Sequence, residues 1–177
     1  NCFYQMYLCT DLSFENYLVD KITKKMLQLN LPTYQFRIKQ SEKNYFILDK
    51  FRKRYVRLTP EEWVRQNFLL FLTEEKGFPA ALMAVEKQLF IHGMKKRCDA
   101  VLYDLNAQPQ IIIELKAPHI PINQAVFDQL AVYNAKLHVQ YFMVSNGMEH
   151  YCCRVNSENA AYEFFEGIPH HSVFSSQ

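Results

Sequence analysis

The sequence predicts a single α/β domain in which helices flank a mixed β-sheet. Length is the first reason, because 177 residues suit one domain with one hydrophobic core. The order of segments is the second, since a helix pattern is followed by three strand-like runs, another helix pattern and further strand-like runs. Composition is the third: 49% of the residues are hydrophobic and only 4 are glycine, which is typical of a folded chain.

The N-terminal part combines an expected extension with the start of the main domain. Residues 1–25 are expected to lie outside the main fold, which spans 26–177. Ser13 is placed to cap a helix whose apolar residues recur at helical spacing until Pro32. After it, apolar and polar residues alternate over 34–48 around a polar interval, which predicts a β-hairpin.

The next helix has a clear start and a clear end. Thr59 is a capping residue, Pro60 suits the first helical position, and Glu62 completes the pattern of a capping box. Gly77 follows the last residue of the helical pattern. We therefore predict a helix over 60–76.

Strand-like runs and a second helix complete the predicted domain. Runs at 84–91, 98–104 and 110–116 are separated by turn residues and predict a three-stranded meander. A helix is expected over 123–136, after two prolines. The remaining strands are expected at 140–145, 151–155 and 162–165, with an Asn146-Gly147 turn after the first of them.

Charge and cysteine usage exclude several classes of protein. The formal net charge is only +2, so affinity for nucleic acid would have to come from basic residues gathered on one face. The 5 cysteines are odd in number and form no C-x-x-C pair, which indicates a reducing, cytoplasmic environment and not a disulfide framework. No targeting or membrane-spanning segment is visible in these residues, so no membrane partner is expected.

Two acidic residues and a lysine stand on strand-like runs that are otherwise apolar. Glu114 and Lys116 end the run 111–116, and their spacing of two residues puts both on one face of a strand. Asp99 lies on the preceding strand, and the hairpin-like connection at 106–109 allows the two strands to pair. The sequence therefore predicts that the carboxylates of Asp99 and Glu114 face one space.

Two such carboxylates suit a divalent metal ion. Burying a carboxylate is costly unless it is paired or binds a metal, and Mg²⁺ commonly takes one or two protein carboxylates. We expect Asp99 and Glu114 to be catalytic metal ligands for Mg²⁺ or Mn²⁺, with Lys116 as the third catalytic residue in phosphodiester hydrolysis. An ion pair of Glu114 and Lys116 at a solvated strand end is the structural alternative. Without metal, repulsion between the carboxylates should raise the pKa of one of them.

The flanking sequence places these residues in a known context. Asp99 followed by Glu114-Leu115-Lys116 resembles the PD-(D/E)xK nuclease signature, with Cys98 where the superfamily pattern has proline. Over roughly residues 55–155 the chain resembles the nuclease-like N-terminal domain of type I restriction endonuclease R subunits. The segments that carry this resemblance are Leu58–Val64, Lys96–Asp99, Glu114–Pro118, Phe127–Gln129 and Ser145–Gly147.

The resemblance implies a restriction-endonuclease-like fold and a metal-dependent deoxyribonuclease. By this likeness, Asp99 and Glu114 match metal ligands and Lys116 matches the catalytic lysine, while Gln129 and Tyr133 match an auxiliary Gln-x-x-x-Tyr motif. It also implies DNA as substrate and the specificity and motor subunits of a restriction-modification system as partners, with a homodimer left open. No G-x-x-x-x-G-K-[ST] motif occurs in these residues, so no ATP site is expected in this chain.

Three auxiliary candidates also have purely structural interpretations. Glu62 matches an acidic residue that some relatives carry, but its capping position alone would explain it. Core packing would explain Tyr133, and a solvated helix face would explain Gln129.

Basic residues mark candidate DNA contacts. Lys96 and Arg97 lead directly into Asp99, and we expect them to bind phosphate. Other basic residues join them only if the fold gathers them at one rim, the alternative being a solvated face. This second group comprises Lys50, Arg52, Lys53, Arg54, Arg57 and Lys95. The six histidines lack the spacing of a zinc site.

Two other classes of function compete with a nuclease. A non-catalytic module that keeps the nuclease fold would bind DNA or protein without hydrolysis, although such a module has no need to keep Asp99, Glu114 and Lys116. The 14 Phe and 11 Tyr residues would also fit a structural interaction domain. Binding of divalent metal to the wild type and to an Asp99→Ala variant separates the nuclease from the binding module.

Overall fold

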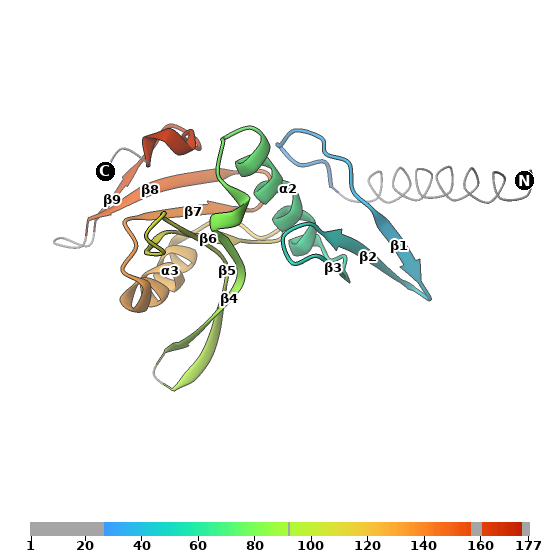
Figure 1. Ribbon diagram of the computed structural model, residues 1–177, viewed down its shortest axis with the longest axis horizontal. Coiled ribbons are helices and arrows are strands. Elements are labelled where there is room, and N and C mark those ends of the chain that lie inside the picture. The colour runs from blue at the N-terminus through green and yellow to red at the C-terminus, as the bar shows by residue number, and fades with distance from the viewer. Residues whose placement is uncertain (1–26, 92, 157–160, 175–177) are drawn as a thin grey trace, which may run out of the picture.

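Two β-sheets share one helix in this protein (Figure 1). The computed structural model describes residues 27–91, 93–156 and 161–174. The first sheet is antiparallel and consists of β1 (Ile38–Ser41), β2 (Asn44–Asp49) and β3 (Arg54–Arg57). The predicted extension at 1–25 lies outside the described residues.

The second sheet has six strands in the order β4-β5-β6-β7-β8-β9. Its strands are β4 (Met83–Ile91), β5 (Met94–Tyr103), β6 (Pro109–Leu115), β7 (Tyr141–Ser145), β8 (His150–Asn156) and β9 (Ala161–Phe164). β6 and β7 are parallel, whereas all other neighbours in this sheet are antiparallel. The prediction of a mixed sheet that begins with a three-stranded meander is confirmed.

Helix α2 (Pro60–Glu74) covers one face of the larger sheet and is held at its start by the predicted cap. The Glu62 amide donates to Thr59 Oγ1 at 3.1 Å, which satisfies one of the free amides at the helix start. The helix ends two residues earlier than predicted, just before Gly77, whose φ of 71° suits a helix terminus. The short 3-10 helix η1 (Ala80–Leu82) then leads into β4.

Helix α3 (Gln124–Leu137) covers the opposite face and links the parallel strands β6 and β7. Asn123 caps its start through Oδ1, which accepts from the Ala125 amide at 3.1 Å. Because successive strand residues point to opposite faces, the apolar run at 111–113 contributes side chains to the hydrophobic core on each face of the sheet. Ile111 and Ile113 pack with α2 residues, whereas Ile112 packs with α3 residues. The sheet is therefore a layer between two helices, as the continuous apolar strand predicts.

The smaller sheet packs on the other side of α2. Ile38 and Ile47 form a cluster with Trp63 and Leu70 of the helix. The predicted hairpin is confirmed as β1 and β2, but β3 was not predicted, because its sequence combines a charge run with only two half-buried residues. Helix α2 is thus buried between two sheets, which explains why so few of its residues are exposed.

The predicted helix that was to end at Pro32 is wrong where it can be compared with the structure. Most of that helix falls on residues outside the described ranges, but residues 27–29 are not helical. Leu29 instead packs against both clusters that flank α2. The Asn30 amide donates to the Gly147 carbonyl at 2.7 Å, so tertiary contacts with the predicted β7–β8 turn hold this segment extended.

Candidate active site

The central strands β5 and β6 bring Asp99 and Glu114 together at one end of the larger sheet. Ala100 pairs with Ile113 across these antiparallel strands, so the preceding Asp99 stands opposite Glu114. The Leu115 amide donates to Asp99 Oδ2 at 2.6 Å and holds the aspartate against β6. The charge of Asp99 acts on Glu114, so the two carboxylates lie near one another.

Glu114 is buried with one oxygen held and the other free. Lys116 Nζ donates to Glu114 Oε1 at 2.6 Å, and Gln129 Nε2 donates to the same oxygen at 2.7 Å. Lys116 Nζ also reaches Gln129 Oε1 at 3.2 Å. Glu114 Oε2 is buried and has no hydrogen-bond partner among the described residues. The pair of Glu114 and Lys116 is therefore not a fraying surface ion pair, since Glu114 is only 4% exposed.

The pKa of Glu114 is raised to about 7, first by burial and second by the nearby charge of Asp99. The hydrogen bonds and charge of Lys116 oppose this shift, as does the hydrogen bond from Gln129. The predicted rise in the pKa of one carboxyl is confirmed in direction. Burial and not repulsion is its largest cause, because Ile112 and the α3 core lie on the same face.

Gln129 and Tyr133 lie one helical turn apart on α3 and form a chain of hydrogen bonds to the site. Gln129 Nε2 lies 2.7 Å from Tyr133 Oη as well as 2.7 Å from Glu114. Tyr133 Oη donates to the Arg97 carbonyl at 3.2 Å. Tyr133 is also part of the α3 core cluster, so it both packs and bonds. Gln129 is not on a solvated helix face.

Arg65 of α2 is a site residue that sequence reasoning missed. Its Nη2 donates to Asp99 Oδ1 at 2.5 Å and to Glu61 Oε1 at 3.2 Å, while Nη1 bonds Glu62. Burial alone would lower the pKa of Arg65, but the charges of Asp99 and Glu62 raise it overall. The available signal was the spacing of this arginine after Glu61 and Glu62 on a helix with little polar surface.

The Glu62 side chain does more than cap the helix. Its oxygens accept hydrogen bonds from Arg52, Arg65 and Gln66, and the distance from Arg52 Nη2 is 2.5 Å. The cap at Thr59 accepts a hydrogen bond from the Glu62 amide but makes no contact that would explain the buried Glu62 carboxylate. Capping alone therefore does not explain the residue, because its buried charge is joined through Arg65 to Asp99.

A distorted residue of β4 stands beside Asp99. Glu86 has φ of 53°, a left-handed conformation that residues other than Gly, Asn and Asp seldom adopt. Its carboxylate lies 2.7 Å from Arg52 Nη1, 3.2 Å from Arg97 Nη1 and 3.8 Å from Arg65 Nη1. Glu86 thus joins the cluster, and no periodic pattern in the sequence indicated it.

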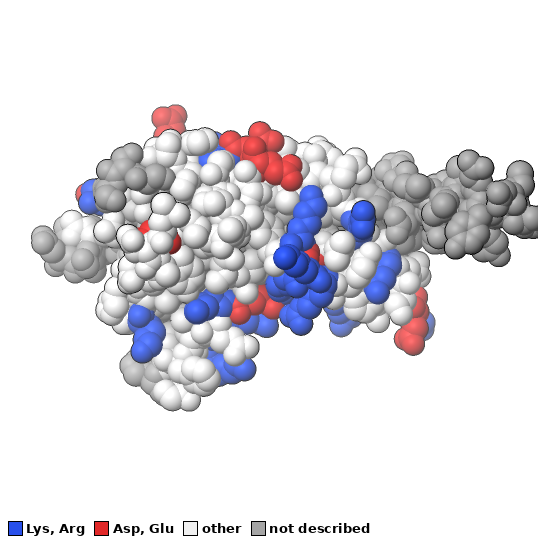
Figure 2. Space-filling model, viewed as in Figure 1, with Lys and Arg blue, Asp and Glu red and all other residues white. Residues whose placement is uncertain are grey.

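Lys96 and Arg97 follow one another on β5, so their side chains point to opposite faces of the strand pair. Arg97 faces a cavity of about 430 Å³ beside Glu86. The other residues that line this cavity are Arg52, Arg54, Val85 and Gln88. Figure 2 shows Lys and Arg gathered in the middle of this face, over α2 and β3. The fold therefore gathers part of the basic group at one rim, whereas Lys96 points away from it.

The rest of the basic group divides between structure and surface. Arg52 forms ion pairs with Asp49, Glu62 and Glu86 and is largely buried, so its charge is neutralised within the protein. Lys50 lies 3.8 Å from Glu74 at the other end of α2. Lys53 and Arg57 are exposed, as are Arg54 and Lys95.

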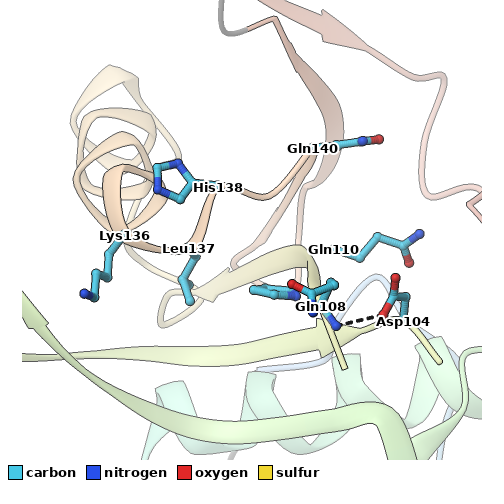
Figure 3. Close-up of a pocket in the computed structure, with 8 residues that line it drawn as sticks. Asp104, Gln108, Gln110, Lys136, Leu137, His138 and Gln140 are labelled. Atoms are coloured by element: carbon cyan, nitrogen blue, oxygen red, sulfur yellow. Dashed lines mark hydrogen bonds between the residues drawn. The ribbon is translucent and has the colours of Figure 1, made fainter. Parts of the chain in front are cut away.

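A second cavity, of about 550 Å³, lies at the opposite end of the larger sheet (Figure 3). Its acidic side chain is Asp104, whose Oδ1 accepts from the amides of Asn106 and Gln108 at 2.9 and 2.8 Å. Figure 3 shows the Asp104 carboxylate beside Gln108, away from Lys136 and His138. This carboxylate is used to close the β5–β6 turn, so the candidate site remains the one around Asp99 and Glu114.

Within the described residues, no group of three or more His, Cys, Asp and Glu side chains is arranged to hold a metal ion. A metal at the candidate site would have two carboxylates, Asp99 and Glu114, as its protein ligands. In the same part of the chain, no helix has the length and apolar character needed to cross a membrane.

Comparison with known proteins finds a matching family model and a similar solved structure. Residues 60–169 match a family model described as "Type I restriction enzyme R protein N terminus (HSDR_N)". The structure is similar to a fragment structure assigned to an HsdR subunit of a type I restriction enzyme from Vibrio vulnificus YJ016, with 18% sequence identity and a TM-score of 0.48. That similarity covers 66% of this chain and only 24% of the other. No curated protein sequence matches the chain.

Proposed function

The chain belongs to the family of type I restriction enzyme R protein N termini, and from that premise we propose that it is a metal-dependent DNA endonuclease domain. The proposed reaction is hydrolysis of phosphodiester bonds. Asp99 and Glu114 are its metal ligands, and Lys116 is its catalytic lysine. This proposal assigns a role to Asp99 in the middle of β5 and to Glu114 and Lys116 at the end of β6.

The free oxygen of Glu114 carries the proposal. A buried carboxylate oxygen without a partner is costly, and such groups in proteins normally meet a donor or a cation. Oxygen ligands suit Mg²⁺ and Mn²⁺, and a site with two carboxylates leaves positions for water and phosphate. Glu114 Oε2 beside Asp99 is therefore a fitting place for a hard divalent cation.

Residues of the chain orient the attacking water and supply positive charge near the phosphate. A bound Mg²⁺ or Mn²⁺ would polarise the phosphate and lower the pKa of the attacking water. Lys116 Nζ, held at 2.6 Å from Glu114, is partly exposed and can donate to the water or to a phosphate oxygen. Its positive charge stabilises the negative charge that develops on the phosphate during hydrolysis.

Gln129, Tyr133 and Arg65 are positioning residues in this proposal. Gln129 bridges Lys116 and Glu114, and so holds the ammonium against the glutamate. Tyr133 anchors Gln129 to β5. Arg65 balances the charge of Asp99 and fixes its carboxylate. Together they hold the three catalytic groups before substrate arrives, which is how preorganised sites accelerate reactions.

The proposed partners are DNA and the specificity and motor subunits of a restriction-modification system. Membership of the family supports this assembly. No G-x-x-x-x-G-K-[ST] motif occurs in the sequence, so ATP-driven movement along DNA would depend on residues outside it.

Cleavage of supercoiled plasmid with Mn²⁺ tests the proposal. We expect the wild type to nick or linearise the plasmid, and EDTA to stop the reaction. Lys116→Ala should keep the fold and cut the rate by a factor of about 10²–10⁴, as expected for a group that transfers a proton or stabilises charge. Asp104→Asn is the matched control, because this aspartate lies at the other end of β5 and serves only the turn.

Equal cleavage by wild type and Lys116→Ala would remove the lysine from the mechanism. Cleavage that persists in EDTA would show that the reaction does not need a metal ion.

A binding module that lacks hydrolysis is the second candidate, and the ion pair of Arg65 with Asp99 favours it. A guanidinium at 2.5 Å already neutralises the aspartate, so the site holds together without metal. A wild type that binds DNA but neither takes up Mn²⁺ nor cleaves would establish this candidate instead.

A further inference from the structure

Strands β4 and β5 continue past the sheet as a two-stranded arm, defined here as residues 87–91 and 94–98. Pairing of β5 with β6 begins at Ala100, so the arm residues pair only with each other. Figure 1 shows this hairpin projecting from the body of the protein. Such an extension of a sheet is exposed on both edges and requires a reason to be kept ordered.

The inner face of the arm packs on helix α3. Leu89, Ile91 and Cys98 belong to the same core cluster as Phe127 and Leu130. Uninterrupted alternation would instead place Leu89 on the same face as Val85, which packs toward α2. The left-handed residue at position 86 reverses the alternation, so the arm is held by α3 in a fixed orientation.

The outer face combines an exposed aromatic ring with cations. Phe90 pairs with Lys95, and Gln88 pairs with Arg97, so these four side chains share that face. Phe90 is 67% exposed. Met94, the arm's other exposed large hydrophobic side chain among the described residues, pairs with Ile91 and lies on the inner side. One ring offers far too little apolar area for a protein interface, which takes about 800 Å² from each partner.

At its base, the outer face meets the cavity that Arg54 and Arg97 line. The acidic group there, Glu86, already interacts with Arg52, Arg65 and Arg97. Arg54 is exposed and Arg97 keeps 58% of its side chain exposed, so both guanidinium groups can reach an anion. Lys95 extends the positive charge toward the end of the arm. Figure 2 shows further Lys and Arg along this part of the molecule.

We propose that the outer face of the arm binds a single-stranded segment of DNA. Phosphates lie against Arg54, Lys95 and Arg97, and one base stacks on Phe90. An aromatic ring can stack only on an unpaired base, and grooves that combine such rings with positive charge are typical of single-strand binding. The proposal rests on the proposed function, because DNA bound on this face would lie beside the proposed active site. Arg97 contacts Glu86, and Arg65 contacts both Glu86 and Asp99.

Fluorescence anisotropy of a labelled thymidine oligonucleotide of about 16 residues, in EDTA, measures this binding without cleavage. We expect the wild type to bind the oligonucleotide more tightly than a blunt duplex of the same length. Phe90→Ala should weaken binding about 5-fold to 150-fold, the loss expected for one stacked base. Phe90→Trp should restore it. Phe164→Ala is the matched control, since Phe164 is an exposed aromatic residue on the far strand β9.

Salt dependence tests the cations separately. Lys95→Ala and Arg97→Ala should each lower the slope of log affinity against log salt by about 0.7, the value for one phosphate contact on a single strand. Failure of the wild type to bind the oligonucleotide, equal binding by Phe90→Ala, or unchanged slopes would each overturn the proposal. Because EDTA is present throughout, these outcomes are independent of whether the plasmid is cleaved.

Discussion

At the scale of single residues, the site is a balance of buried charges. Arg65 and Arg52 lie among the carboxylates of Asp49, Glu62 and Asp99, and each guanidinium contacts more than one of them. Breaking a buried pair leaves an uncompensated charge, which costs more than the pair contributes. Substitutions here should therefore affect stability and metal binding in opposite directions.

Arg65→Ala tests that opposition. Without metal, we expect the variant to lose about 3–5 kcal/mol of unfolding free energy, because Asp99 and Glu62 keep their buried charge. Mn²⁺ should then stabilise the variant more than it stabilises the wild type, since a cation replaces the lost guanidinium. Urea unfolding with EDTA and with Mn²⁺ gives the four values, and Arg37→Ala, an exposed arginine, is the control. A smaller metal effect in Arg65→Ala than in the wild type would contradict this account.

Glu114 should make stability depend on pH. Its carboxyl keeps a proton in the folded state up to a pKa of about 7, whereas the ordinary value is 4.5. Between these values the folded state binds more protons than the unfolded state, so unfolding free energy falls as pH rises and levels off above about 7. Glu114→Gln should flatten this dependence in urea unfolding at several pH values in EDTA, while exposed Glu163→Gln should not. Parallel pH profiles for wild type and Glu114→Gln would refute the shift.

At the scale of elements, helix α2 connects the two sheets to the site. It presents Arg65 and Glu62 near its start, so the first turn must be well formed for the charges to meet. Its N-cap, Thr59, is therefore the element's most sensitive exposed position.

Thr59→Ala removes the acceptor for the Glu62 amide. We expect a loss of about 1 kcal/mol of unfolding free energy, within the range of about 0.5–2 found for lost caps. Chemical denaturation measures it, with Thr33→Ala, at an exposed position outside any helix or strand, as control. A change no larger than that of the control would show that tertiary packing alone fixes the helix start.

The elements also show where sequence patterns stop being informative. Thr59 and Gly77 located α2, and the two prolines before it located α3, to within two residues, because these residues act locally. The turn at Asn146-Gly147 and the antiparallel pairing of β5 with β6 were likewise predictable from spacing. The contacts of Arg65 and Glu86 could not be predicted from spacing. They depend on how α2 crosses the sheet and on the left-handed backbone of Glu86, which reverses the side-chain alternation in β4. Only the folded chain brings those residues together.

At the scale of the whole molecule, the site lies where both sheets and both long helices approach one another. The smaller sheet contributes Arg54, α2 contributes Arg65, α3 contributes Gln129, and the larger sheet contributes Asp99 and Glu114. This convergence explains how a chain with a net charge of only +2 gathers Lys and Arg in one patch.

Calorimetric titration of Mn²⁺ tests the central claim most directly, namely that Asp99 and Glu114 form a metal site. The titration is best made above pH 7, where Glu114 has lost its proton. We expect one saturable binding event in the wild type, and its loss or strong weakening in Asp99→Asn, which keeps the shape but removes a charged ligand. Absence of binding in the wild type, or equal binding by Asp99→Asn, would contradict the account.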